Sequence, residues 1–410
     1  MNETSSKKQL RSSQAMQQFQ KEWFKDIQAR IKGGEPYGIC NADEVEEVFT
    51  FFGMPVIVVQ WWAAVIAAKR MSEHYSKVLA ERGYDMDHYN SIGLGCTLDN
   101  NPETAPWGGL PKPAVIIGSV ENDHSIKSKE LWAQEFGCPL FPMEKGETTT
   151  LSRPNWWENI RDHWDEIIEP HLLDFRVQQL RELIKFLEVM TGKQLSLARI
   201  RGVLELSNEQ NDYWREARDL IAKTVPCPVS LPDQLSMYPA QWHRGTTHGR
   251  DLIKGFYEEV EERVQNGEAA CPNERIRLMW IGPGLWSNTA FYQYFEEKYG
   301  ATFVCSMYTG IAGDGYPRKI KDDPLRALAS RHLFIGLGDP AWLVKEAKLH
   351  QCQGAVRFPG GSANPAPIEP AFKKAGIPLL EIPGHNVDSR KWDDAKVKSL
   401  VSEFIETAAA

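Results

Sequence analysis

Several short polar segments of the sequence combine side chains that could bind or activate a carbonyl group. Asn122, Asp123 and His124 follow an apolar run at residues 113–118. Amide and carboxyl groups in such a loop could hold a carbonyl oxygen through hydrogen bonds. The same residue types also cap helices, so Asn122 or Asp123 could instead begin the helix predicted after them. We predict a catalytic role for Asn122 and a substrate contact for Asp123, with helix capping as the alternative.

A second segment, residues 242–248, concentrates an indole, two imidazoles, a guanidinium group and hydroxyl groups. We predict that His243 takes part in catalysis and that Trp242 and Arg244 contact the substrate, because this mixture suits a polar acyl group or phosphates. The exposed start of a helix would have a similar composition, and that alternative stays open.

Two glycine-bearing turns could bring backbone N–H groups close to an anion. Gly284 lies in the turn 282–288, and Gly361 and Ser362 lie in the turn 357–364. Adjacent glycines let a ligand approach the backbone closely. Neither turn completes a nucleotide-binding fingerprint, so plain tight turns are the alternative. We predict ligand contacts from Gly284 and Gly361 and a catalytic role for Ser362.

The seven cysteines are spread along the chain without a CxxC pair, which argues against a zinc knuckle and a disulfide framework. Cys40 differs from the others because it follows a predicted strand and precedes a helix N-terminus, which would lower a thiol pKa. We predict a catalytic role for Cys40, with core packing as the alternative, and a substrate contact for Asn41. The other thiols are expected to be buried or inert. The sequence has no Ser-His-Asp, HExxH or EF-hand pattern, and no metal site is predicted.

The elements that position these segments are predicted from apolar runs that alternate with helical patterns. In the first part of the chain, the runs at 54–59, 113–118 and 139–141 indicate buried parallel strands, with helices over 44–52 and 125–136. Further strands are indicated near the C-terminus, at residues 276–281, 302–305, 354–358 and 377–382. Ligands of such doubly wound sheets sit beyond the carboxyl ends of the strands.

The pattern therefore predicts an α/β protein with two parallel-sheet domains joined by a helical segment. Almost no glycine interrupts residues 155–221, where apolar residues recur at helical spacing. We also expect substrate contacts from Tyr308 and Thr309, which follow a strand of the second sheet. The predicted units are a leading helix, an N-terminal α/β domain, a helical middle region and a C-terminal α/β domain, over residues 1–34, 35–150, 151–270 and 271–410.

Composition restricts the classes of function. The 410 residues are 42% hydrophobic and 25% charged, and 47 Lys and Arg against 55 Asp and Glu give a net charge of −8. Such a chain lacks the basic field of a nonspecific nucleic-acid binder. No apolar run is long enough for a membrane span, so we expect a cytoplasmic protein. The 14 tryptophans are expected in the core or at subunit contacts, or as a stacking surface for an aromatic acyl group.

Several of these segments, in this order, resemble the 2-hydroxyacyl-CoA dehydratase and benzoyl-CoA reductase family, in its iron–sulfur-bearing component. The resemblance covers most of the chain from about Tyr37. Its carrying segments are residues 43–56, 122–141, 180–192, 277–283, 306–310 and 376–390. None is specific by itself, but their order and spacing together are characteristic.

This resemblance implies two flavodoxin-like domains and a related partner subunit, in a heterodimer or heterotetramer. Members of the family eliminate water from 2-hydroxyacyl-CoA thioesters or reduce an aromatic acyl-CoA ring. They use one low-potential electron from an ATP-hydrolysing activator protein. The cofactor implied by the resemblance is a [4Fe–4S] cluster held by three cysteines.

The sequence departs from its relatives at the cluster. The expected cysteines fall on Asn122, near Ser362 or Ala363, and near residues 85–88, where no thiol occurs. Amide and hydroxyl groups are poor iron–sulfur ligands. We predict that this chain binds a CoA thioester while a related partner carries the cluster. The alternatives are a structural or regulatory subunit, or a cluster-free enzyme that polarises CoA esters through Asn122, His243 and backbone N–H groups.

Overall fold

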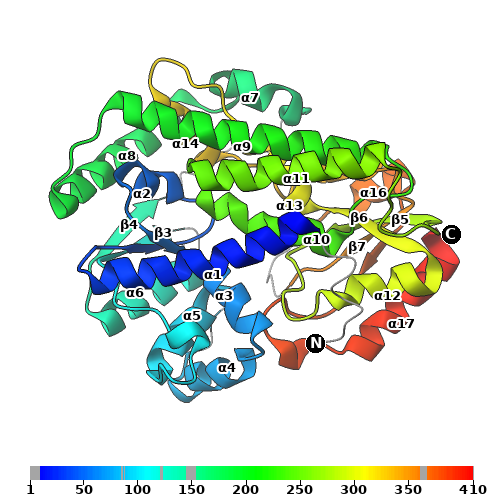
Figure 1. The fold of residues 1–410 in the computed structure, drawn as a ribbon, viewed down its shortest axis with the longest axis horizontal. Helices are drawn as coiled ribbons and strands as arrows, with labels where there is room; N and C mark the ends of the chain where they lie inside the picture. Colours follow the sequence, from blue (N-terminus) through cyan, green and yellow to red (C-terminus); the bar gives the residue numbers. More distant parts are fainter. Residues whose placement is uncertain are drawn as a thin grey trace.

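The computed structural model describes residues 10–84, 86, 88–120, 123–144, 154–360 and 367–409. Within them the chain forms two separate four-stranded parallel sheets flanked by helices (Figure 1). The first has the order β2-β1-β3-β4, with β1 (Gly38–Cys40), β2 (Val56–Val58), β3 (Val115–Val120) and β4 (Leu140–Glu144). The second has the order β6-β5-β7-β8, with β5 (Ile276–Ile281), β6 (Ala301–Ser306), β7 (Gly354–Arg357) and β8 (Leu379–Glu381). The predicted fold class is confirmed.

Burial of the strands follows from their apolar sequences. Every residue of β1, β2, β5, β6 and β7 is buried, as expected for strands covered by helices on both faces. The edge strands β4 and β8 consist of half-buried and exposed residues, apart from the buried Met143. The two sheets have the same strand order, so the carboxyl ends of their strands are arranged in the same way.

The helices around the first sheet follow the predicted alternation. Helix α1, the predicted leading helix, packs against α10 and α11. The helices of this part are α1 (Arg11–Lys32), α2 (Glu46–Phe52), α3 (Val59–Ala68), α4 (Ser72–Glu81), α5 (His88–Asp99), the short η1 (Pro106–Gly108) and α6 (Asp123–Phe136).

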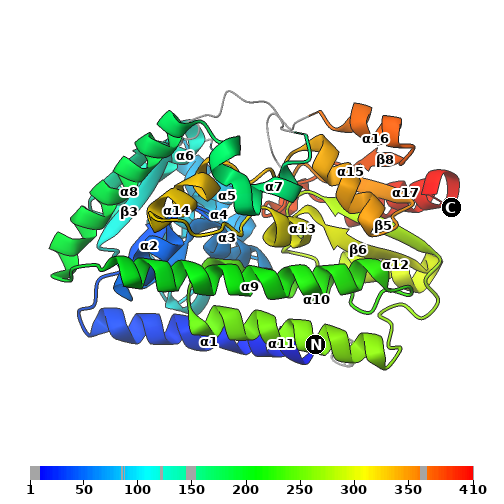
Figure 2. The same cartoon turned by 90° about the horizontal axis from the view of Figure 1, so that it is seen from above.

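A helical segment connects the two sheets. It comprises α7 (Trp156–Ile167), α8 (Pro170–Thr191), α9 (Leu197–Lys223), α10 (Leu231–Met237), η2 (Tyr238–His243) and α11 (Thr247–Gln265). With 27 residues, α9 is about 40 Å long and contacts α2 at one end of the molecule and β6 at the other. Figure 2 shows α1, α9 and α11 running alongside one another beneath both sheets.

The helices of the last part of the chain cover the second sheet, with one exception. Helix α14 packs against α8 and α9, on the side of the first sheet. The helices here are α12 (Ala290–Tyr299), α13 (Met307–Asp314), α14 (Pro324–Leu333), α15 (Pro340–Leu349), α16 (Glu369–Ala375), η3 (Ser389–Lys391), α17 (Asp394–Phe404) and η4 (Ile405–Ala409). Among the residues described, none of the helices is both long and apolar enough to cross a membrane.

Candidate functional site

The carboxyl ends of strands from both sheets meet at one place in the molecule. In each sheet the chain reverses its strand order beside the first strand, β1 or β5, and such a reversal opens a crevice for ligands. Asp43, just after β1, accepts a hydrogen bond from the hydroxyl of Tyr316. The charge of Asp43 also acts on Tyr308, which follows β6. The loops at these strand ends therefore face each other.

The loop after β1 is fixed by its own polar side chains. The Asn41 side chain donates hydrogen bonds to Glu44 (2.9 Å) and to Ser125 (3.1 Å), and it is buried. The backbone N–H of Ala42 donates to Gln60 (2.7 Å). Asn41, a predicted substrate contact, is thus engaged in holding the loop.

A buried ion cluster lies beneath this loop. Arg244, which is 0% exposed, pairs with Asp43 (3.1 Å), Glu46 (3.4 Å) and Glu47 (3.0 Å). Glu47 also binds the guanidinium group of Arg331 on α14 through both of its oxygens. We refer to these five residues as the ion cluster. It joins three parts of the chain that are far apart in sequence.

The two adjacent glutamates of the ion cluster differ in ionisation. Burial raises the pKa of Glu46 to about 8, because Arg244 only partly compensates for the lost hydration. Burial acts on Glu47 in the same direction, but Arg331 and Arg244 outweigh it and lower the pKa of Glu47 to about 2. At neutral pH a proton therefore resides on Glu46, while Glu47 carries the charge between the two guanidinium groups.

Three tyrosine rings lie next to the ion cluster, beside Arg244 and Asp43. The guanidinium group of Arg244 lies 4.7 Å from the ring centre of Tyr316. The hydroxyl groups of Tyr316 and Tyr238 are 2.9 Å apart, and the ring of Tyr238 stacks on Tyr308 at 4.8 Å. Burial raises the pKa of all three phenols, so they stay neutral hydrogen-bonding groups.

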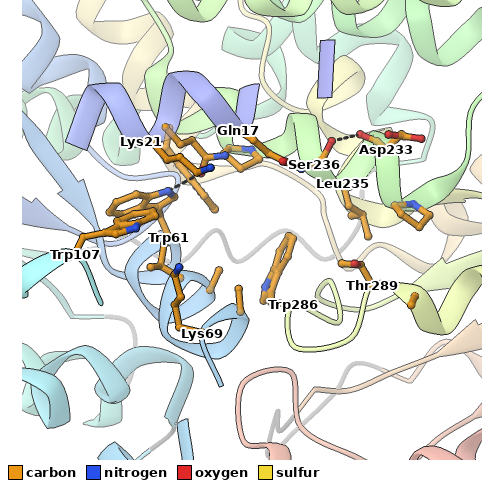
Figure 3. Close-up of a pocket in the computed structure, with 18 of the residues that line it drawn as sticks. Gln17, Lys21, Trp61, Lys69, Trp107, Asp233, Leu235, Ser236, Trp286 and Thr289 are labelled. Atoms are coloured by element: carbon orange, nitrogen blue, oxygen red, sulfur yellow. Dashed lines mark hydrogen bonds between the residues drawn. The ribbon is translucent and has the colours of Figure 1, made fainter. Parts of the chain in front are cut away.

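A cavity of about 620 Å³ adjoins these rings and lies between the two sheet-containing parts (Figure 3). Trp61 of α3 and Trp107 form one wall, with ring centres 5.9 Å apart, and Trp286 faces them from the loop after β5. Two lysines, one from α1 and one at the end of α3, lie at this cavity, and within the described residues neither forms an ion pair. The principal lining side chains are Gln17, Lys21, Trp61, Lys69, Trp107, Asp233, Ser236, Trp242, Trp286 and Thr289.

The segment 242–244 connects the cavity with the ion cluster. Trp242 lines the cavity, and its buried indole N–H has no hydrogen-bond partner within the described residues. Its ring contacts Tyr238 at 6.0 Å. Arg244, two residues on, is the centre of the ion cluster. His243 points elsewhere: it is buried against the rings of Phe19 and Trp23, and burial lowers its pKa to about 3.

The other predicted site residues lie in different surroundings. Thr309 forms a capping box with Ser306 at the start of α13, and Gly284 packs so closely on Trp286 that a Cβ would lie 2.8 Å from that ring. Asp123 is exposed at the first residue of α6, and Tyr308 belongs to the aromatic group beside the ion cluster. Asn122, Gly361 and Ser362 lie outside the described residues.

The environment of Cys40 differs from the one predicted, and so does the direction in which its thiol pKa is shifted. It is fully buried at the end of β1, and this burial, with the nearby charges of Glu46 and Glu44, raises its thiol pKa well above the ordinary value. The expectation that a helix N-terminus lowers this pKa is wrong. The reason is that α2 begins only at Glu46 and carries buried carboxyl groups in its first turn.

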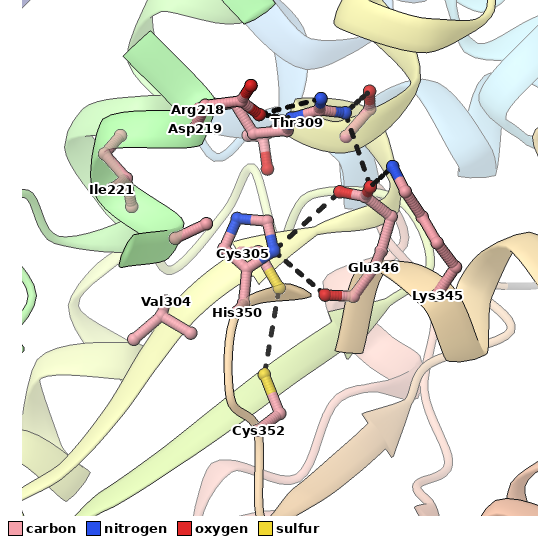
Figure 4. A network of polar contacts seen from close by, with 12 residues as sticks. Arg218, Asp219, Ile221, Val304, Cys305, Thr309, Lys345, Glu346, His350 and Cys352 are labelled. Carbon is pink, nitrogen blue, oxygen red and sulfur yellow. Dashed lines mark hydrogen bonds and ion pairs between the residues drawn. The ribbon is translucent and has the colours of Figure 1, made fainter. Parts of the chain in front are cut away.

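The seven cysteines, all within the described residues, are free thiols. Cys305 and Cys352 have sulfur atoms 4.0 Å apart, beside the buried network of Arg218, Glu346 and His350 (Figure 4). Among the described residues, no three Cys, His, Asp or Glu side chains gather in a way that could hold a metal ion.

Sequence reasoning identified Tyr308 but not Tyr238, Tyr316 or the carboxylates of this site. Glu46 and Glu47 stand in a stretch of mixed acidic and apolar residues, which is typical of a half-exposed helix. In the structure α2 is buried on nearly all sides. A buried position for adjacent glutamates requires Arg244 and Arg331, and nothing in the spacing of a single sequence pairs those residues with α2.

Comparison with known proteins matches most of the chain to one family model. The family model described as 2-hydroxyglutaryl-CoA dehydratase, D-component, matches residues 63–408. The chain belongs to this family. The predicted resemblance to the 2-hydroxyacyl-CoA dehydratase family is thereby confirmed.

Relatives of this dehydratase-family chain match it over most of their length. The chain is 22% identical to the (R)-2-hydroxyisocaproyl-CoA dehydratase alpha subunit of Clostridioides difficile, over 91% of the chain and 90% of that protein. It is 21% identical to the alpha subunit of the lactoyl-CoA dehydratase of Anaerotignum propionicum, over 98% and 97%. It is 29% identical to a subunit of the benzoyl-CoA reductase of Thauera aromatica, over 72% and 71%.

The ion cluster predicts opposite effects for two neighbouring, isosteric substitutions. A carboxyl group with a raised pKa in the folded state favours folding when protonated, so the contribution of Glu46 falls as the pH rises from its ordinary pKa of 4.5 towards 8. Glu46→Gln should abolish this fall and make the protein more stable than wild type above about pH 8, by at least about 1 kcal/mol. Glu47→Gln should destabilise it by about 3–5 kcal/mol, because two buried guanidinium groups lose their carboxylate. Denaturant unfolding at several pH values measures both effects, and equal losses for the two variants would contradict this assignment.

Proposed function

We propose that this chain is a subunit of an acyl-CoA-processing complex of the 2-hydroxyacyl-CoA dehydratase and benzoyl-CoA reductase type. In this complex it binds a CoA thioester, while a related partner subunit carries the [4Fe–4S] cluster. The observation that carries the proposal is the cavity of about 620 Å³ beside the ends of the strands. It combines four indoles with two lysines that form no ion pair within the described residues.

The chemistry of the cavity suits a CoA thioester. CoA has a flat adenine ring and several phosphates at one end, and a flexible arm that ends in the acyl group. Indole rings bind flat rings by stacking, and ammonium groups bind phosphates as point charges. The cavity volume lies within the usual range for small-molecule sites, about 300–1,000 Å³.

The acyl end would be directed towards the tyrosines. Trp242 contacts the cavity on one side and Tyr238 on the other. The hydroxyl of Tyr316 already donates to Asp43 and that of Tyr238 to Tyr316, whereas the buried indole N–H of Trp242 has no partner within the described residues and could orient a thioester carbonyl. This arrangement supports binding and orientation by this chain. It does not require a reactive thiol, which agrees with the high pKa of Cys40.

The assignment of the cluster to a partner rests on the distribution of sulfur. The thiols of this chain occur on separate elements, and only Cys305 and Cys352 form a close pair among the contacts of the described residues. That this chain itself holds no cluster stays a prediction. An ATP-hydrolysing activator that supplies the electron would be a further partner.

Two lysine substitutions test the binding half of the proposal. Lys21→Glu combined with Lys69→Glu should weaken binding of benzoyl-CoA by at least about tenfold, because two attractive charges at the cavity become repulsive. Quenching of tryptophan fluorescence, with four indoles in the cavity, measures the affinity. The control is Lys185→Glu, an exposed lysine on α8 away from the cavity. No binding by the wild-type protein would favour a structural or regulatory subunit. Equal binding by all variants would show that the ester lies elsewhere.

Iron analysis tests the cluster half. The chain purified alone under strict exclusion of oxygen should contain no stoichiometric iron and show no visible bands of iron-bound thiolates. The complex with its related subunit should contain about four iron atoms per cluster. A brown, iron-bearing preparation of this chain alone would contradict the assignment. An iron-free complex that still converts CoA esters would instead favour a non-radical enzyme.

A further inference from the structure

Arg318, in the segment between α13 and α14, has a buried guanidinium group that is held by backbone carbonyls. Its side chain is 3% exposed. Its terminal nitrogens donate to the carbonyls of Gly315 (2.8 Å), Pro317 (2.9 Å) and Phe334 (2.6 Å). Within the described part of the chain, no carboxylate forms an ion pair with it. Buried charges are ordinarily paired, because a buried unpaired charge is strongly destabilising.

A second guanidinium group with an unused donor lies beside it. Arg331 binds Glu47 through its two terminal nitrogens, but its Nε has no hydrogen-bond partner within the described residues. The Nε of Arg318 has none there either. The proximity of Arg331, added to burial, lowers the pKa of Arg318 to about 9, so Arg318 remains charged at neutral pH. Two cations thus lie close together with two donors unused.

Both arginines line one very small cavity. About 10 Å³ of it is open to the centre of a water-sized particle, which is room for one such particle or one slightly larger ion. The other polar side chains around it are engaged: the hydroxyl of Ser207 donates to Glu47, and the amide of Asn208 binds the backbone N–H and carbonyl of Arg318. Tyr316, whose hydroxyl donates to Asp43, and leucine, isoleucine and alanine side chains form the rest of the wall.

The cavity favours an anion over a water molecule. A neutral water molecule would leave the charge of Arg318 uncompensated, whereas an anion offsets it. A monatomic anion accepts from both donors and has no proton to place. The space has room for one small particle, which a monatomic anion matches.

We propose that this cavity binds one small monovalent anion, of which chloride is the representative, between the guanidinium groups of Arg318 and Arg331. The site adjoins the ion cluster, because Arg331 lines the cavity and also pairs with Glu47. With Glu46 protonated, the guanidinium groups of Arg244, Arg318 and Arg331 outnumber the ionised carboxylates by one, and a single bound anion restores the balance. The anion therefore supports α14 and, through Glu47, the loop after β1.

Thermal unfolding at constant ionic strength tests the proposal. Replacing sodium gluconate by sodium chloride should raise the melting temperature by about 2 °C for each tenfold increase in chloride above its dissociation constant, whereas gluconate cannot enter the cavity. Crystals of the protein grown with sodium bromide should show an anomalous scattering peak between Arg318 and Arg331. Absence of both the chloride response and the bromide peak would overturn the proposal.

A pair of arginine variants separates this site from general salt effects. Arg318→Met removes the charge that needs a counter-ion, so its melting temperature should no longer respond to chloride. The matched control is Arg326→Met on α14, which removes a half-buried arginine paired with Asp174 and should retain the full response. An equal chloride response in both variants would contradict the proposal. If Arg318→Met does not fold, the bromide peak in the wild-type protein decides the question.

Discussion

The position of Glu47 between two buried guanidinium groups constrains the whole molecule. Charges taken out of water are tolerated only when they are closely paired. Glu47 comes from the start of α2, Arg244 from the turn between η2 and α11, and Arg331 from α14. The pairing therefore brings these three regions together. It explains why α14, which follows the second sheet's β6 in sequence, packs against α8 and α9 on the side of the first sheet.

This constraint also shapes the candidate site. The loop after β1 cannot move away from Tyr316 and Tyr238 without breaking contacts of Asp43 with Arg244 and Tyr316. The cavity with its four tryptophans lies next to this fixed region, between the two sheet-containing parts. A ligand in the cavity would therefore contact both parts at once. The site is a property of how the two parts are joined, because neither sheet supplies all of its walls.

The sequence allowed the parallel strands to be predicted because their apolar runs have one physical explanation, burial on both faces. Residues 276–281 and 301–306 illustrate this. The site was less predictable. Trp242 and Arg244 could be identified from their unusual composition, but Glu46 and Glu47 had the pattern of an exposed helix. His243 shows the opposite case, since its neighbours in sequence suggested reactivity while aromatic packing in the structure makes it a neutral, buried ring. Long-range ion pairs and ring contacts have no signature in the spacing of a single sequence.

The central proposal is that this chain, a member of the 2-hydroxyglutaryl-CoA dehydratase family, contributes a CoA-ester site formed by both of its sheet-containing parts. Hydrogen–deuterium exchange of its complex with the related subunit, with and without benzoyl-CoA, tests this claim most directly. The account predicts slower exchange on addition of the ester in α3, in η2 and in the segment from Trp286 to Gln293, which lie around the cavity. Protection confined to the partner subunit, or no change in these three segments, would contradict it.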